Sequence, residues 1–487
     1  MIKHNLNISC TTLLALVLTA CAIPAVQAAP PNYEDDVRPI LKKHCLSCHN
    51  ADKKENGLDL SSFKSVQLGS SGGAVVKAGL PKTSPLYLAI SHHEDYAPMP
   101  PNKPKLAAPT LKKIHDWIAG GLLATAGGKS QLREVAFNIS AGSMKRPKNP
   151  AFPTILDPQP IAKTVSAPAI LALACSPWSN LIASSGHRQV LLFGNETSVS
   201  GELQYLGALP FPEGDIHDIR FSRNGELLVV AGGIGADSGN VAVFEVRSGK
   251  RIATLGDEYD IVLSADITAD HKYVAVGTPA KLVKVYSTKD GKLVHRIKKH
   301  TDWVTVVRFS PDGQQLASAD RNGGIHIWEM PAAGILYSLS EHKTKVTSLS
   351  WRQDSKVLAS GAEDGHFILW DMKDGWATRS IPAHVGKARS RYSRRSGILD
   401  IQFAHDGQLI TTGRDHSLRS WKADGSSAAK AVDTMSLPLS NAISPDGQHA
   451  FIGGFDGTIQ IWNVRRSKLQ QLINALQIPT ASSSKTP

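Results

Sequence analysis

A repeat constrains the fold of this chain more than any other feature of its sequence. Aromatic residues that each close an apolar segment follow one another at intervals of about 41 to 42 residues, with two longer intervals of about 51. They are Phe193, Phe244, Tyr286, Trp328, Trp370, Trp421 and Trp462. In the last four copies, two strand-like segments separated by Asp/Gly-containing turns precede the closing strand. Seven such units predict an all-β, seven-bladed propeller over residues 161–475.

The four C-terminal copies resemble WD40 repeats, and the three earlier copies resemble them more weakly. In that family a buried His, Ser/Thr, Asp and Trp network holds a turn of each blade. The resemblance implies such a network for His342, Ser360, Asp364 and Trp370. The copy that ends at Trp328 has Asn322 where the aspartate is expected. We expect these recurring polar residues to be structural, because a satisfied polar network in each blade explains their recurrence without catalysis.

A second motif, "HCLSCH" at residues 44–49, lies far upstream of the repeat. Its spacing fits a zinc half-site, a redox dithiol or a covalent haem. A structural zinc site normally needs a second pair of ligands, and a redox dithiol normally follows a strand in a βαβ unit; neither is seen nearby. Haem uses all three residues, with Cys45 and Cys48 as thioethers and His49 as an axial iron ligand. The motif therefore predicts one covalently attached haem c.

The second axial position of such a haem needs its own ligand. The segment "HHEDYAPMPPNKP" offers Met99, which stands among Pro98, Pro100 and Pro101. Prolines stiffen a loop and suit the placement of a flexible thioether, so Met99 is the predicted ligand. His92, His93 and an open coordination site are the alternatives.

Two amphipathic helices are expected around this loop, in "YEDDVRPILKKHC" and "TLKKIHDWIAGG". The succession "VRPILKKHCLSCHN", "GLDLSS", "GGAVVKAGLPKTSPLYLAI", "APMPP" and "LKKIHDWIAGG" resembles the planctomycete-type cytochrome c domain over residues 31–125. The resemblance implies a small all-α domain of the class I cytochrome c kind, whose haem transfers electrons. A linker is expected over residues 126–160, and a disordered tail over residues 476–487.

The N-terminus predicts export. Lys3 precedes an apolar run of about a dozen residues, and small residues follow up to Ala28. We expect a signal peptide over residues 1–28 and a bacterial, periplasmic protein. The alternative is a lipobox, "LTAC", whose Cys21 would carry a lipid anchor. No later segment has the ~20 apolar residues of a membrane span, so no transmembrane segment is expected.

Charge gives a further expectation about partners. The formal net charge is +12, which in an exported protein favours an acidic protein partner over nucleic acid. The insertion "HVGKARSRYSRRSG" lengthens one repeat interval and concentrates positive charge. We predict that this insertion docks an acidic redox partner, with a merely solvated loop as the alternative. Its cations are Lys387, Arg389, Arg391, Arg394 and Arg395.

Three functions agree with these patterns. The leading one is electron transfer by a His/Met-ligated haem, with the propeller as a partner-binding platform, because a doubly ligated iron has no free site for substrate. The second is a haem-containing subunit of a periplasmic oxidoreductase with substrate chemistry at the propeller. The third is a haem-based redox sensor, in which the linker permits domain motion. The sequence favours an electron-transfer and binding protein over an enzyme in its own right.

Overall fold

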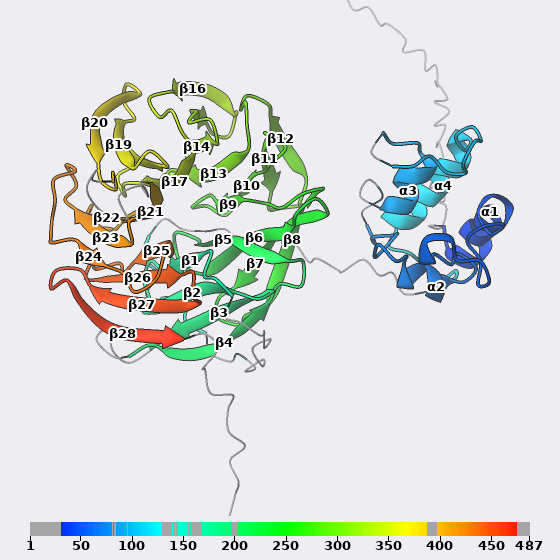
Figure 1. Ribbon diagram of the computed structural model, residues 1–487, viewed down its shortest axis with the longest axis horizontal. Coiled ribbons are helices and arrows are strands. Elements are labelled where there is room, and N and C mark those ends of the chain that lie inside the picture. The colour runs from blue at the N-terminus through cyan, green and yellow to red at the C-terminus, as the bar shows by residue number, and fades with distance from the viewer. Residues whose placement is uncertain are drawn as a thin grey trace, which may run out of the picture. The chain divides into compact units, whose positions relative to one another are not determined.

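The chain forms two compact units, Met1–Leu132 and Arg133–Pro487 (Figure 1). The computed structural model describes residues 31–79, 81, 84–94, 96–128, 139, 142, 145–153, 156, 168–195, 202–386 and 397–474. Within these ranges no helix is both long enough and apolar enough to cross a membrane. The predicted signal peptide, the lipobox at Cys21 and the tail from residue 476 lie outside the described residues.

The N-terminal unit is helical, as expected. Its elements are the π-helical turn η1 (Tyr33–Val37), α1 (Arg38–His44), the 3-10 turn η2 (Glu55–Gly57), α2 (Phe63–Leu68), α3 (Pro85–Ile90) and α4 (Ala108–Ala119). The two helices predicted from amphipathic spacing are present as η1 with α1, and as α4. Gly120 follows α4 as its C-cap, and Gly121 then adopts a φ of 89°, which favours glycine.

The first and last helices of this unit pack together around aromatic side chains. Trp117 and Tyr33 are fully buried, with ring centroids 5.9 Å apart. Their polar atoms are satisfied, because Trp117 Nε1 donates to the Leu123 carbonyl at 2.9 Å and the Tyr33 hydroxyl donates to the Leu60 carbonyl at 2.8 Å. Both aromatics therefore fasten segments from the two ends of the unit to one core.

The second unit is a seven-bladed β-propeller, which confirms the prediction from the repeat (Figure 1). Each blade is a sheet of four antiparallel strands in sequence order. Hydrophobic clusters lie between neighbouring blades, for example between blades 4 and 5 and between blades 1 and 7. Each sheet thus buries both faces of its inner strands, which is why strands such as β3 and β6 are apolar at almost every position, whereas outer strands such as β20 are exposed.

The strands of the first four blades have the following bounds. Blade 1 holds β1 (Leu173–Cys175), β2 (Leu181–Gly186), β3 (Gln189–Gly194) and β4 (Gln204–Pro210). Blade 2 holds β5 (Asp215–Phe221), β6 (Leu227–Ile234), β7 (Ser238–Glu245) and β8 (Arg251–Glu258). Blade 3 holds β9 (Ser264–Ile267), β10 (Tyr273–Gly277), β11 (Val283–Ser287) and β12 (Leu293–Ile297). Blade 4 holds β13 (Val304–Phe309), β14 (Gln315–Asp320), β15 (Ile325–Glu329) and β16 (Gly334–Leu339).

The last three blades complete the ring. Blade 5 holds β17 (Val346–Trp351), β18 (Val357–Ala362), β19 (His366–Asp371) and β20 (Trp376–Pro382). Blade 6 holds β21 (Ile398–Phe403), β22 (Leu409–Gly413), β23 (Ser417–Trp421) and β24 (Val432–Asp433). Blade 7 holds β25 (Pro438–Ile443), β26 (His449–Gly454), β27 (Thr458–Asn463) and β28 (Lys468–Asn474).

The outer strand of blade 7 comes from the same end of the chain as the rest of that blade. β28 pairs with β27, and among the described residues all four strands of this sheet come from the same stretch of chain, β25 to β28. The ring closes instead through contacts between blades. Gln471 bridges to Leu203 by accepting from its backbone N–H at 2.9 Å and donating to its carbonyl at 3.0 Å. Ile170 donates to the Gly454 carbonyl at 3.0 Å.

The closure contact predicts the effect of one substitution. Gln471→Ala leaves both backbone groups of Leu203 without this partner, and we expect a loss of about 1–2 kcal/mol in the free energy of unfolding. Gln470→Ala, at the exposed neighbouring position, is the matched control and should be near neutral. Urea unfolding followed by tryptophan fluorescence measures both. Equal stability of the two variants would contradict a closing role for Gln471.

Buried polar networks inside the blades follow the WD40 pattern. In blade 4, His300 Nδ1 donates to Asp320 at 2.9 Å, and the Ser318 hydroxyl bonds His300 Nε2 at 2.7 Å. Trp328 Nε1 donates to the same hydroxyl at 2.8 Å. The carboxylate can only accept, so it fixes the imidazole tautomer and the order of the chain of bonds. Blade 6 repeats the arrangement with His384, Thr411, Asp415 and Trp421.

Two details differ from the sequence expectation. In blade 4 the aspartate of the network is Asp320, two residues before the expected Asn322, which instead donates to Thr301 at 3.1 Å. In blade 5, predicted as the best match, His342 and Trp370 both reach Ser360 at 2.8 Å. Its Asp364, however, stays 3.6 Å from His342 Nδ1, too far for a hydrogen bond. The tightest networks therefore lie in blades 4 and 6.

The shared hydroxyl in blade 4 predicts a stability effect. Ser318→Ala removes one partner from His300 and one from Trp328, so we expect a loss of about 2–3 kcal/mol, since buried groups left without a partner are costly. Ser380→Ala, at an exposed position of β20, is the control and should change stability little. A loss as small as that of Ser380→Ala would show that the network does not stabilise the blade.

Part of the segment predicted as a linker packs on the propeller. Ala151 is buried in a core cluster of blades 1 and 2, with Phe152 and Leu156 packed against it. Arg247 donates to the Asn149 carbonyl at 2.7 Å. Described residues between 149 and 156 are thus held against blades 1 and 2 of the propeller.

Candidate functional site

One cavity in the helical unit brings together all the residues predicted to hold a haem. Cys45, Cys48, His49 and Met99 line it. Its volume is about 370 Å³, and its apolar wall includes Leu60, Val75, Leu86 and Ile90. His92 and His93, the alternative ligands, are not among the residues that line it. Sequence positions some 50 residues apart thus meet at one apolar hollow.

The end of α1 positions the two cysteines and the histidine. Cys45 N–H donates to the Leu41 carbonyl at 2.8 Å, and His49 N–H donates to the Cys45 carbonyl at 3.0 Å, so the motif continues α1 as a tight turn. His49 Nδ1 lies 3.2 Å from the Glu55 carbonyl oxygen. Because a carbonyl can only accept, this nitrogen is the donor, which leaves Nε2 as the acceptor nitrogen of the ring. The cysteines are free, and burial raises the pKa of Cys45 to about 11.

The loop after α3 holds Met99 at the cavity. Met99 N–H donates to the Ala89 carbonyl of α3 at 3.0 Å, which ties the loop to the helix. His92 Nε2 lies 3.2 Å from the Met99 carbonyl oxygen, so this histidine supports the loop. Met99 is partly buried and packs against the core of the unit. Both backbone contacts orient the segment that carries the thioether.

These residues fit a c-type haem. An apolar hollow of this size suits a large flat ring, and thiols, an imidazole and a thioether are the donors that such a haem uses. Among the described residues, no group of three or more His, Cys, Asp or Glu side chains that could hold a metal ion occurs.

Comparisons with known families agree with the geometry. Residues 45–103 match the family model Planctomycete cytochrome C. The helical unit is a cytochrome c-like domain. In the propeller, residues 291–329, 334–371, 386–422 and 435–463 match WD domain, G-beta repeat. No curated protein matches the chain. The cytochrome c match implies haem c binding, and both resemblances seen in the sequence are confirmed.

The propeller has two unlike faces. Fifteen large hydrophobic residues are exposed among the described residues, and seven of them lie at the face where the innermost strands begin. These seven are Leu171, Ile234, Tyr259, Trp303, Val385, Met435 and Phe455, and we call them the apolar face. Six others lie on outer strands, and two lie in the cytochrome c-like domain.

The predicted docking cations lie outside the described residues. They are Lys387, Arg389, Arg391, Arg394 and Arg395.

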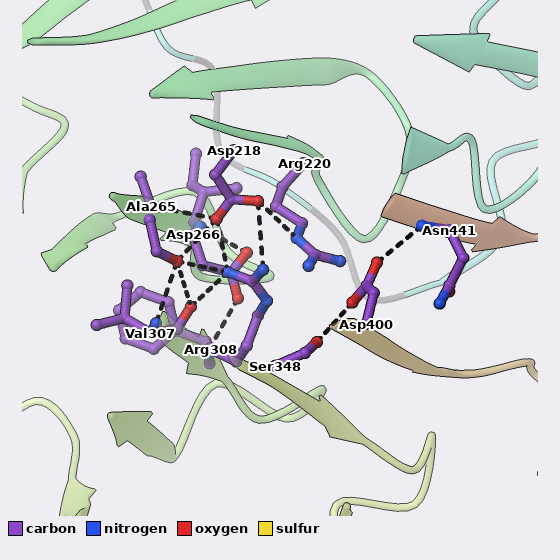
Figure 2. A network of polar contacts seen from close by, with 12 residues as sticks. Asp218, Arg220, Ala265, Asp266, Val307, Arg308, Ser348, Asp400 and Asn441 are labelled. Atoms are coloured by element: carbon purple, nitrogen blue, oxygen red, sulfur yellow. Dashed lines mark hydrogen bonds and ion pairs between the residues drawn. The ribbon is translucent and has the colours of Figure 1, made fainter. Parts of the chain in front are cut away.

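The innermost strands carry a buried ionic network that sequence reasoning missed (Figure 2). Arg308 of β13 pairs with Asp218 of β5 through two contacts, at 2.8 and 3.2 Å. Asp266 of β9 accepts from the backbone N–H groups of Ile267 and Phe309. A sequence signal did exist, since Asp and Arg interrupt otherwise apolar inner strands such as "DIHDIRF" and "VTVVRF".

Buried imidazoles predict that the propeller is sensitive to acid. Burial lowers the pKa of His384, and burial with the charge of nearby His300 lowers the pKa of His326 to about 4. The unfolded chain, with histidine pKa near 6.5, takes up protons first, so the free energy of unfolding should fall as pH drops from about 6.5 toward 4. Urea unfolding at about pH 7.5 and about pH 5 measures this. Constant stability across that window would contradict the prediction.

Proposed function

We propose that the protein is an exported electron-transfer protein. In this proposal Cys45 and Cys48 hold one haem through thioether bonds, His49 and Met99 are its axial ligands, and the propeller binds a redox partner. The observation that carries the proposal is that all four residues line a single apolar cavity. A bound haem of this type supplies one-electron exchange. The signal-like sequence before Ala28 supports export to the periplasm.

The protein's own residues have distinct tasks in this function. The Glu55 carbonyl orients the His49 ring, and the Ala89 carbonyl anchors the Met99 backbone, so each axial donor is held by a contact of its own. Leu60, Val75 and Leu86 exclude water from the cavity, which lowers the polarity around the iron position. Lys42 and Lys43 are exposed in the last turn of α1, just before the haem-binding motif, and their charge favours the approach of an acidic partner.

The apolar face supports the proposal of a partner-binding platform. Protein interfaces are enriched in aromatic residues and methionine, and Tyr259, Trp303, Met435 and Phe455 are all exposed on this face. Arg321 lies over the Trp303 ring at 5.2 Å and adds positive charge beside it. The predicted basic insertion falls, in sequence, between β20 and β21. An acidic partner with an apolar centre is the class of protein that this surface fits.

Spectroscopy of two variants tests the haem ligands. In the full, haem-loaded protein we expect a low-spin c-type spectrum, which should change to high-spin in Met99→Ala because the thioether is lost. His93→Ala is the control and should keep the low-spin spectrum. An unchanged spectrum in Met99→Ala would remove Met99 as a ligand. A change in His93→Ala alone would transfer that role to histidine.

Two tryptophan variants test the platform. We expect Trp303→Ala to weaken retention of a partner from the exported protein fraction by about tenfold or more, as removal of an aromatic anchor does. Trp376→Ala, with 75% exposure on outer strand β20, is the matched control and should retain the partner. Affinity capture with the haem-loaded chain and mass spectrometry measures both. Equal retention by the two variants would argue against binding at the apolar face.

A further inference from the structure

The face of the propeller opposite the apolar face opens into a small, charged cavity. All seven innermost strands, or the turns that follow them, contribute to its wall, so it lies at one end of the central channel. Its volume is about 120 Å³, which is room for several water molecules. Three guanidinium groups line it, from Arg220, Arg223 and Arg308, against one carboxylate, from Asp266. The groups that line the wall therefore carry more positive than negative charge, and the carboxylates of Asp218 and Asp400 interact with these arginines from outside the lining.

The three arginines are not equally paired. Arg308 has two contacts with Asp218 and further contacts with Ser264 and the Val307 carbonyl. Among the described residues, Arg220 makes one polar contact, from Nε to the same Asp218, at 3.3 Å. Arg308 and Arg220 thus share the single carboxylate of Asp218, and Arg308 makes the closer contacts with it. In Figure 2 the terminal nitrogens of Arg220 carry no contact to the residues drawn.

The neighbouring acids do not supply the missing acceptors. Asp400 accepts from the Ser348 hydroxyl at 2.6 Å and from the backbone N–H groups of Ile401 and Asn441. Asp266 is likewise occupied by two backbone donors. Within the described residues, the side chain of Arg223 donates one hydrogen bond, to the Phe309 carbonyl at 3.3 Å. Burial lowers the pKa values of Arg220 and Arg223. The charge of Arg308 lowers the pKa of Arg220 further, and the charges of Arg220 and Arg308 lower that of Arg223, while nearby aspartates oppose the shift at both residues.

We infer that this cavity binds a small oxyanion, a carboxylate or a phosphate, through Arg220 and Arg223. Arginine presents a planar pair of donors that matches the two oxygens of a carboxylate or phosphate. The ligand would supply the acceptors that Arg220 lacks and would offset the excess charge of the wall. The small volume favours a free metabolite-sized anion over a protein side chain carried on a bulky backbone.

The cavity lies beside Trp178, which contacts the segment that precedes the propeller. His405 lines the wall and packs edge-on against Trp178, with ring centroids 4.8 Å apart. Arg146, from the segment that precedes the propeller, lies over the Trp178 ring at 5.6 Å. Trp178 Nε1 also donates to the Arg223 carbonyl at 2.8 Å. A ligand that orders Arg223 would therefore act directly beside that segment.

Titration calorimetry on the full, haem-loaded protein tests the inference. The probes are inorganic phosphate and succinate, with uncharged succinamide and sodium chloride of equal ionic strength as comparisons. We expect saturable binding of phosphate or succinate, and the tighter of the two identifies the class of ligand. Arg220→Gln and Arg223→Gln should each weaken binding by roughly tenfold to a hundredfold, the effect of losing hydrogen bonds to a charged group. Lys373→Gln, at an exposed position of the β19–β20 turn, should bind as the unaltered protein does.

The controls separate this site from the haem. Thermal unfolding without ligand shows whether each variant folds, and Arg223→Gln decides the question if Arg220→Gln does not fold. The haem spectrum should stay unchanged in all three variants, so a failed binding test leaves the proposed electron transfer intact. Absence of saturable binding by both anions would overturn the inference, as would equal binding by the unaltered protein and both arginine variants.

Discussion

Burial of both faces of every sheet is the constraint on which the propeller depends. A blade is exposed to solvent only at its loops and its outer strand. Each blade therefore needs a neighbouring blade against both faces of its sheet, which requires the ring to close. Apolar clusters supply most of this burial, and the polar atoms caught inside require partners of their own. The His300 and His384 networks meet that requirement, since each ends on a carboxylate that only accepts. Closure between Gln471 and Leu203 meets it at the last junction.

The sequence was sufficient for features that recur or that depend on local spacing. Seven closing aromatics predicted the propeller, and two helices, a Cys-x-x-Cys-His motif and a methionine among prolines predicted a cytochrome c-like domain; the structure and the family matches confirm both folds. The predicted haem ligands meet at one cavity. Motif spacing did not identify the correct residue where another side chain could reach the same partner. Asp320 reaches His300 from two residues before the expected position, which a fixed motif offset cannot anticipate.

Contacts between segments that are distant in the sequence were also not predicted. The pairing of Asp218 with Arg308 joins blades 2 and 4, so no local pattern announces it, and each residue by itself looks like a polar interruption of a strand. The choice of β28 for the outer strand of blade 7 likewise depends on where the ring ends. Anchoring of Ala151 and Phe152 on the propeller was hidden in a stretch whose Pro, Lys and Gly content suggested a linker. Each of these three features depends on where distant segments lie in the folded structure, which no local sequence pattern specifies.

The continuous strand order of blade 7 bears on how a protein with two compact units matures. In a ring whose last sheet borrows a strand from the opposite end of the chain, the N-terminal side has to be in place before the ring can shut. Here β25 to β28 come from one continuous stretch, and blade 1 is likewise continuous from β1 to β4. Attachment of a cofactor to the helical unit and assembly of the ring therefore impose no order on each other. A cell that lacks the haem supply should still accumulate a finished propeller.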